Sequence, residues 1–301
     1  MTERFVRVDG IELCTERFGD PSDPPVLLVM GVGASMLWWE EDFCRLLARG
    51  GRSVIRYDHR DTGRSVTCEP GHPGYTAADL VDDALRVLDG YALRSAHLVG
   101  VSAGGAFAQL LALHRPERVR SLVLVSTTPA VAATEGEPEL PPPTQEFMRF
   151  FAQSPAEGPP ADQSEEDPAP VIEHRVAYAR LLAGGRRPFD EAAVRLLVRR
   201  EAERAHDVAA ARNHELLPDA EAVHPPLSAV TAPTLVVHGT ADPMFPFPHG
   251  EALARRIRGA RLLALRDAGH GIERPDWQTL ATAILAHTAP PADPARTDAA
   301  D

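Results

Sequence analysis

A serine at position 102 has the sequence context that exposes and activates a hydroxyl group. It lies in Gly100-Val101-Ser102-Ala103-Gly104, between the apolar run 96–99 and a helix-like segment from Phe107 to Leu113. A serine on a sharp turn from strand to helix projects its hydroxyl from the backbone, above the positive end of the helix dipole. Glycines two positions before and after it remove side chains that would clash in so tight a turn. We therefore predict that Ser102 is a nucleophile.

A serine hydroxyl is a poor nucleophile at neutral pH, so it needs a base and an acid that holds the base in its tautomer. Asp242 and His270 follow Ser102 in that order, and each comes after a predicted strand. Parallel strands end at one edge of a sheet, where ligands bind, so these side chains are predicted to meet. Asp267 is the alternative acid, but it is too close in sequence to His270 to orient it easily. We interpret four other histidines as structural: His59, His97, His238 and His249.

The tetrahedral intermediate of acyl transfer needs two N–H donors for its oxyanion. The backbone N–H of Ala103, directly after the nucleophile, is one predicted donor. The loop Gly31-Val32-Gly33 follows the apolar run 26–30, and its glycines let the backbone approach closely. We predict Val32 N–H as the second donor. A simple glycine turn is the alternative interpretation of this loop.

The elements that must position these residues alternate between strand and helix. Residues 4–18 read as a hairpin with its turn at Asp9-Gly10. Six further runs read as strands, and amphipathic helices separate most of them. Of these, 26–30 is the continuous apolar run expected of a strand buried on both faces, and 233–238 returns to that pattern. This pattern predicts an α/β fold with a mostly parallel, eight-stranded sheet flanked by helices. The six predicted strands are 26–30, 53–57, 96–99, 121–126, 233–238 and 261–265.

The alternation breaks after the sixth predicted strand. A segment rich in Pro and Glu is followed by helical patterns near 171–183, 190–203 and 207–216. We predict a helical cap over residues 130–227, a core of residues 1–129 and 228–288, and a disordered tail at 289–301. The arginines of the insertion are predicted to form a solvated face: Arg175, Arg180, Arg186, Arg187, Arg195, Arg199 and Arg200.

Composition limits the partners. The chain has 301 residues and a formal net charge of −12, which argues against nucleic acid or an anionic membrane surface as a partner. We see no apolar signal core and no run near the roughly 20 apolar residues of a membrane span, so we expect a cytoplasmic protein. The three cysteines have no disulfide or zinc spacing. We expect no metal and no cofactor, and the oligomeric state stays open.

These residues resemble the α/β-hydrolases, and within them the aclacinomycin methylesterase group of actinobacterial enzymes. The matching stretches are 28–31 (LVMG), 54–65 (VIRYDHRDTGRS) and 233–236 (PTLV). The resemblance implies an α/β-hydrolase fold, a triad of Ser102, Asp242 and His270, and an oxyanion hole formed by Val32 and Ala103. Ala103 stands where a bulkier residue such as Met is expected, which enlarges the acyl pocket.

The predicted function is hydrolysis of a carboxylic ester through an acyl-enzyme intermediate. The expected substrate is a hydrophobic small-molecule ester, with the methyl ester of an aromatic polyketide as one candidate. Perhydrolase or haloperoxidase, thioesterase and lactonase activities share the triad and stay open, as do a non-hydrolytic biosynthetic enzyme and a small-molecule-binding scaffold. For about half of the aromatic residues near the site, ordinary packing is the simpler interpretation. The predicted substrate contacts are Gly31, Gly33, Trp38, Phe151, Tyr178, Met244 and Phe245.

Overall fold

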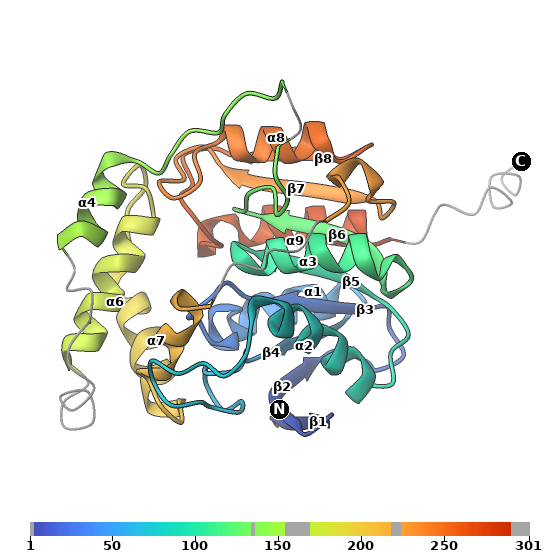
Figure 1. Cartoon of the computed structure of the whole chain (residues 1–301), viewed down its shortest axis with the longest axis horizontal. Coiled ribbons are helices and arrows are strands. Elements are labelled where there is room, and N and C mark those ends of the chain that lie inside the picture. Colours follow the sequence, from blue (N-terminus) through green and yellow to red (C-terminus); the bar gives the residue numbers. More distant parts are fainter. Residues whose placement is uncertain (1–2, 134–135, 154–168, 218–223, 290–301) are drawn as a thin grey trace, which may run out of the picture.

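One eight-stranded sheet forms the centre of the computed structural model, which describes residues 3–133, 136–153, 169–217 and 224–289 (Figure 1). The strand order is β1-β2-β4-β3-β5-β6-β7-β8. β1 and β2 form the predicted hairpin, β2 pairs antiparallel with β4, and the pairs from β4 to β8 are parallel. The prediction of a mostly parallel sheet is confirmed. The strands are β1 (Arg4–Val8), β2 (Ile11–Phe18), β3 (Pro25–Val29), β4 (Ser53–Tyr57), β5 (Ala96–Val101), β6 (Val119–Val125), β7 (Thr234–Gly239) and β8 (Arg261–Leu265).

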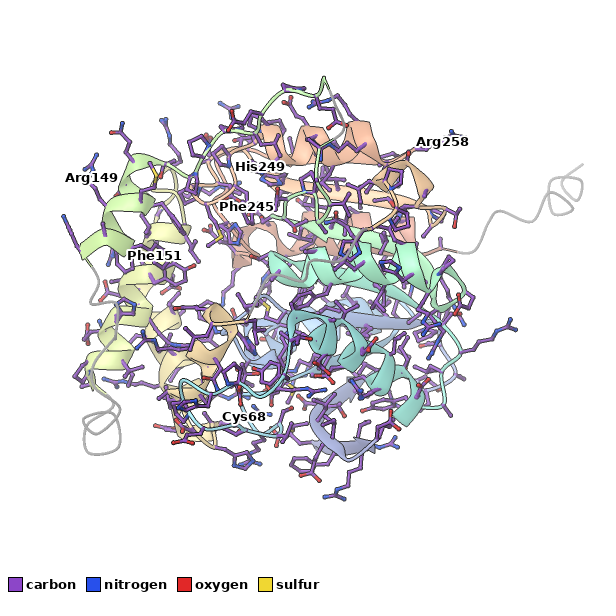
Figure 2. The ribbon with its side chains drawn as sticks, viewed as in Figure 1. Cys68, Arg149, Phe151, Phe245, His249 and Arg258 are labelled. Atoms are coloured by element: carbon purple, nitrogen blue, oxygen red, sulfur yellow. The ribbon has the colours of Figure 1, made fainter. Side chains whose placement is uncertain are left out.

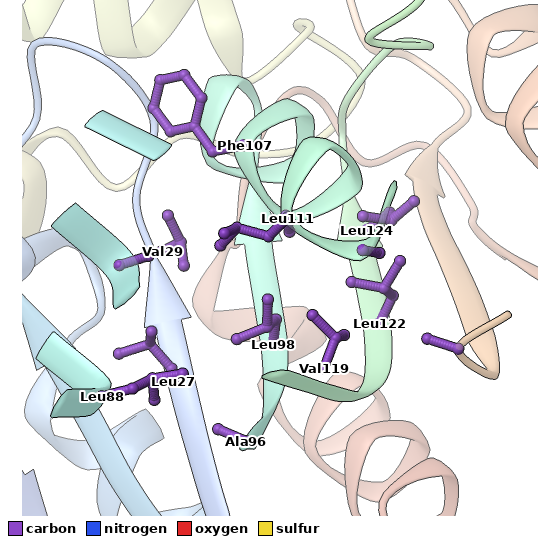
Figure 3. Close-up of a cluster of buried hydrophobic side chains, with 14 of the residues drawn as sticks. Leu27, Val29, Leu88, Ala96, Leu98, Phe107, Leu111, Val119, Leu122 and Leu124 are labelled. Atoms are coloured by element: carbon purple, nitrogen blue, oxygen red, sulfur yellow. The ribbon is translucent and has the colours of Figure 1, made fainter. Parts of the chain in front are cut away.

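Helices cover both faces of this sheet, which is why the central strands are largely apolar. Every residue of β3 and β4 is buried. On one face α2, α3 and α8 pack over Leu27, Leu98 and Leu122, as Figure 3 shows for α3 and its residues Phe107 and Leu111. On the other face α1 and α9 pack over the second core cluster. The helices are α1 (Glu41–Arg49), α2 (Ala77–Gly90), α3 (Ala103–His114), α8 (Pro248–Arg256) and α9 (Trp277–His287), with short 3-10 turns η1 (Met36–Trp38), η2 (Pro116–Arg118), η4 (Leu227–Ala229) and η5 (Arg274–Asp276).

Between β6 and β7 the chain inserts helices that lie beyond the carboxyl ends of the strands (Figure 1). We call α4, α6, α7 and η3 the cap. α6 and α7 pack through a small apolar cluster of Ile172, Val176 and Val198. A helical cap after the sixth strand is as predicted, and its bounds at 130 and 227 stay a prediction. The cap elements are α4 (Gln145–Gln153), α6 (Ala169–Leu182), α7 (Glu191–Arg204) and η3 (Ala210–Glu215).

The cap departs from the sequence prediction in two places. The segment before residue 154 was predicted without a helix, but α4 forms there. Thr144 accepts a hydrogen bond from the N–H of Phe147, and aromatic residues recur at helical spacing behind it. The helix predicted at 207–216 is only the short η3 turn. The tail predicted at 289–301 lies outside the described residues beyond Ala289, and no described helix is long and apolar enough to cross a membrane.

Candidate active site

Ser102 lies on the strained turn between β5 and α3. Its backbone has φ 54° and ψ −124°, in the left-handed half of conformational space that a non-glycine residue rarely adopts. The flanking glycines make this turn possible. A Cβ at Gly100 would lie 2.3 Å from the carbonyl oxygen of Gly104, and one at Gly104 would lie 2.3 Å from that of Val29. The turn therefore holds the Ser102 side chain at the carboxyl edge of the sheet.

Asp242 and His270 come from the two strands beyond β6 and are in direct contact. Asp242 follows β7 and His270 follows β8, and Oδ2 of the carboxylate lies 2.9 Å from Nδ1 of the ring. The other carboxylate oxygen, Oδ1, accepts the backbone N–H groups of Met244 and Phe245 at 2.9 and 2.8 Å. The structure thus brings the predicted acid and base together, with Nε2 of His270 left free of this contact.

The charge state of Asp242 suits this arrangement. Burial opposes ionisation of the Asp242 carboxyl group. The neighbouring His270 and the hydrogen bonds that the carboxylate accepts outweigh burial and lower the pKa of Asp242 below its ordinary value. The structure describes both Ser102 and His270, and their side chains do not hydrogen-bond to each other. Contacts of this kind often tighten only when substrate is bound.

A second histidine, His238, lies beside the same carboxylate. Its Nε2 donates to the carbonyl oxygen of Phe245 at 2.7 Å and lies 3.5 Å from Oδ2 of Asp242. Burial lowers the pKa of His238, so the ring is neutral. It serves as a buried hydrogen-bond donor to the backbone. Within the described ranges no three His, Cys, Asp or Glu side chains are grouped as ligands for a metal ion.

The cap contacts the His270 loop through backbone atoms. The N–H of His270 donates to the carbonyl oxygen of Leu182, the last residue of α6, at 2.7 Å. A Cβ at Gly269 would lie 2.2 Å from that same oxygen, and one at Gly184 would lie 2.3 Å from the carbonyl oxygen of Ala241. Glycine is required at both positions because the two backbones touch there. The cap is therefore packed directly on the loops that carry the acid and the base.

The loop after β3 lies against Ser102, as the predicted oxyanion hole requires. A Cβ at Gly31 would be 3.2 Å from Cβ of Ser102. The N–H of Gly33 donates to Nδ1 of His214, a residue of η3, at 2.8 Å, so this N–H is already engaged. The N–H of Val32 stays the predicted donor in this loop. Ala103 is the first residue of α3, where backbone N–H groups have no intrahelical acceptor.

Two charged cap residues hold the same loop, a role that the sequence did not predict for either of them. The guanidinium group of Arg175 donates to the carbonyl oxygen of Gly33 and to Glu201. Glu201 is buried and accepts from the N–H of Ser35 at 2.7 Å and from Nε1 of Trp38 at 3.1 Å. The prediction of a solvated face is wrong for Arg175, because a buried carboxylate needs a charged partner. The indole N–H of Trp38, a predicted substrate contact, is therefore already bound by Glu201.

The other predicted substrate contacts lie in two groups. Phe245 packs its ring on His270, with centroids 5.6 Å apart, and Met244 next to it is half-buried. Phe151 of α4 is 45% exposed and contacts Tyr178 of α6, with centroids 5.6 Å apart. In Figure 2, Phe151 lies on the cap and Phe245 lies on the loop between β7 and α8. Phe147 and Phe150 complete an aromatic cluster around Tyr178.

His214 makes the stability of the fold sensitive to acid. Burial lowers its pKa to about 3, whereas a histidine of the unfolded chain has a pKa of about 6.5. As pH falls below 6.5 the unfolded state binds the proton first, so stability is lost at up to about 1.4 kcal/mol per pH unit until pH 3. When the pH is lowered from 7 to 5, the free energy of unfolding falls in both proteins. We expect this fall to be about 2 kcal/mol smaller for His214→Asn than for the wild type. Urea unfolding of both proteins at both pH values measures this difference, and equal losses would contradict it.

Comparison with known proteins places this geometry in a family. The family model for the alpha/beta hydrolase fold matches residues 24–272. The chain is 38% identical to rhodomycin D methylesterase DnrP of Streptomyces peucetius and 36% identical to rhodomycin D methylesterase DauP of Streptomyces sp. strain C5. Each match covers 96% of this chain and 98% of the relative.

Solved structures agree on the fold. A hydrolase from Pseudomonas aeruginosa is 30% identical, with a TM-score of 0.63 over 96% of this chain and 99% of that one. An esterase from Exiguobacterium antarcticum is 21% identical, with a TM-score of 0.71 over 95% and 99% of the two chains. With the family model, the two near-full-length relatives and the observed sheet in agreement, the chain belongs to the alpha/beta hydrolase fold family.

Proposed function

We propose that this chain is a serine hydrolase that cleaves a carboxylic ester through an acyl-enzyme intermediate. The observation that carries the proposal is the hydrogen bond between Asp242 and His270, made at the sheet edge where Ser102 turns out of β5. A nucleophile, a base and an orienting acid at one strand edge are the parts that this chemistry needs. Two N–H donors, Val32 and Ala103, complete the proposed site.

Each proposed role follows from the contacts. Asp242 fixes the proton of His270 on Nδ1, so Nε2 is the acceptor for the Ser102 proton. Oγ of Ser102 then attacks the ester carbonyl carbon, and the oxyanion is stabilised by the N–H groups of Val32 and Ala103. His270 gives the proton to the leaving alcohol and then takes one from water, whose oxygen attacks the acyl carbon. When the bond from that carbon to Oγ of Ser102 breaks, His270 returns the proton to Oγ, which releases the acid and restores the free serine.

We further propose a bulky hydrophobic ester as the substrate class, with the methyl ester of an aromatic compound as the first candidate. The aromatic cluster of the cap offers ring faces for such a group, since Phe150 stacks on Tyr178 and Phe151 is partly exposed. Ala103, in place of the bulkier residue expected after the nucleophile, is predicted to enlarge the acyl pocket. Two relatives are named as methylesterases of rhodomycin D, which supports this choice.

Intact-mass labelling with a small fluorophosphonate tests the proposal. The wild type should gain one adduct, and the folded Ser102→Ala variant should gain none, because only an activated serine displaces fluoride. A panel of methyl esters, thioesters, lactones and peroxide-dependent assays then separates the activities that share the triad. Cleavage of bulky aromatic methyl esters ahead of short esters would support the substrate class. A folded wild type without an adduct would overturn the proposal in favour of a binding or non-hydrolytic role.

A further inference from the structure

The loop proposed to bind the oxyanion is held at both ends by buried histidine rings. Before it, Nε2 of His59 donates to the carbonyl oxygen of Met30 at 2.9 Å. After it, the N–H of Gly33 donates to Nδ1 of His214 at 2.8 Å. The two rings meet edge to face, with centroids 6.0 Å apart. Val32 lies between these two fixed points, and the residue is 42% exposed, so it is not held by full burial in the core.

The hydrogen bonds of His214 assign its tautomer. A backbone N–H can only donate, so Nδ1 must be the acceptor for Gly33 and carries no proton. Nε2 therefore carries the proton and donates to the carbonyl oxygen of Arg60 at 2.8 Å. Arg60 is itself fixed to the core, because its guanidinium group makes hydrogen bonds of 2.7 and 2.8 Å to the buried Asp83 of α2. His214, a cap residue, thus connects the loop at Gly33 to Arg60, which is held by the core.

We infer that His214 is a positioning residue for ester hydrolysis: by accepting the Gly33 N–H, it aims the N–H of Val32 at the oxyanion beside Ser102. This inference rests on the proposed function. An oxyanion donor stabilises the transition state only when it already points at the developing charge. The Val32 N–H cannot be aimed by the Val32 side chain, so its direction depends on the peptide groups on either side. His214 fixes the peptide that follows it.

The glycine at position 33 explains why the contact comes from the cap. Gly33 has φ +69°, a conformation that favours glycine, and a Cβ there would lie 3.7 Å from the carbonyl oxygen of Ala211 in η3. The same short turn carries His214, so η3 and the loop contact each other along their backbones. Arg175 holds the Gly33 carbonyl oxygen from α6. Both polar groups of Gly33 are therefore bound by the cap, whereas sheet pairing ends before it at β3.

Two polar variants of similar size separate positioning from mere packing. In His214→Asn the amide oxygen takes the place of Nδ1 and can still accept the Gly33 N–H. In His214→Gln the amide reaches the place of Nε2, toward Arg60, and the Gly33 N–H loses its acceptor. We expect the Gln variant to lose about 30-fold in kcat, below the 10²–10³-fold cost of deleting a donor, with KM within about threefold. The Asn variant should recover most of that loss.

Fluorophosphonate labelling rates and steady-state kinetics on one ester give the readout, and thermal melts confirm folding. His97→Asn is the control, since His97 bonds Ser121 on the sheet and the change should leave kcat within twofold. Equal kcat for wild type, Asn and Gln variants, or a lower kcat for Asn than for Gln, would overturn the inference while the proposed function stands. No labelling of the wild type would overturn both. If the Gln variant does not fold, His214→Ala with added imidazole replaces it: recovery of kcat supports the inference and no recovery overturns it.

Discussion

Replacing Asp242 with asparagine should lower kcat for ester hydrolysis about 10⁴-fold with little change in KM. The two backbone N–H groups of Met244 and Phe245 already donate to Oδ1 of Asp242. An asparagine must place its oxygen there, so its NH₂ group faces Nδ1 of His270. That ring would then carry its proton on Nε2 and could no longer accept one from Ser102. Steady-state kinetics at neutral pH and the rate of fluorophosphonate labelling measure the loss.

Asp267 supplies the matched control for this substitution. It is the alternative acid in the sequence, and it is exposed, with its carboxylate near Arg266. Its backbone has φ 59°, which asparagine tolerates well, so Asp267→Asn should leave kcat within about twofold of the wild type. A large loss at 267 together with a small loss at 242 would reverse the assignment of the acid.

Replacing Gly104 with alanine should destabilise the fold by about 3 kcal/mol or more and remove most activity. A Cβ there would lie 2.3 and 2.5 Å from the carbonyl oxygens of Val29 and Met30. Both are backbone atoms at the end of β3, so neither can move aside without shifting the strand that leads into the oxyanion loop. Urea unfolding monitored by tryptophan fluorescence measures the change.

Gly10→Ala separates steric overlap from backbone preference. Gly10 has φ +79° in the hairpin turn between β1 and β2, and nothing lies within 4 Å of an added Cβ. Alanine should therefore cost only the strain of its left-handed conformation, about 1–2 kcal/mol, and leave activity unchanged. An equal loss of stability at positions 10 and 104 would contradict the overlap argument.

The sheet and the contact between Asp242 and His270 could be predicted because their signals are local. A strand buried on both faces is mostly apolar, as β3 is along its whole length, and parallel strands end at a common edge. Residues in the loops that follow the neighbouring strands β7 and β8 are therefore close in space whatever separates them in sequence. The Gly-x-Ser-x-Gly turn adds its own steric requirement, which the glycine environments of β5 and α3 explain.

The cap contacts could not be predicted, since no local pattern encodes them. His214 is 181 residues from Gly33, and Glu201 is 166 residues from Ser35. A charged residue on a helix reads as solvent-facing until a buried partner is known, which is why Arg175 was assigned to the surface. α4 was not predicted for another reason. The prolines at 141–143 and the acidic stretch before them favour a segment without a helix, although three aromatic residues follow at helical spacing.

The backbone contact between α6 and the His270 loop bears on how this scaffold can acquire new specificities. Domain grafting treats an inserted helical unit as a module that can be exchanged while the catalytic residues stay behind. Here the carbonyl oxygen of Leu182 accepts the His270 N–H, and Gly184 leaves room for the backbone of Ala241. A chimera with a foreign insert must also preserve these two backbone contacts, because without them the base His270 would be misaligned. Specificity and reactivity are therefore transplanted together in this protein.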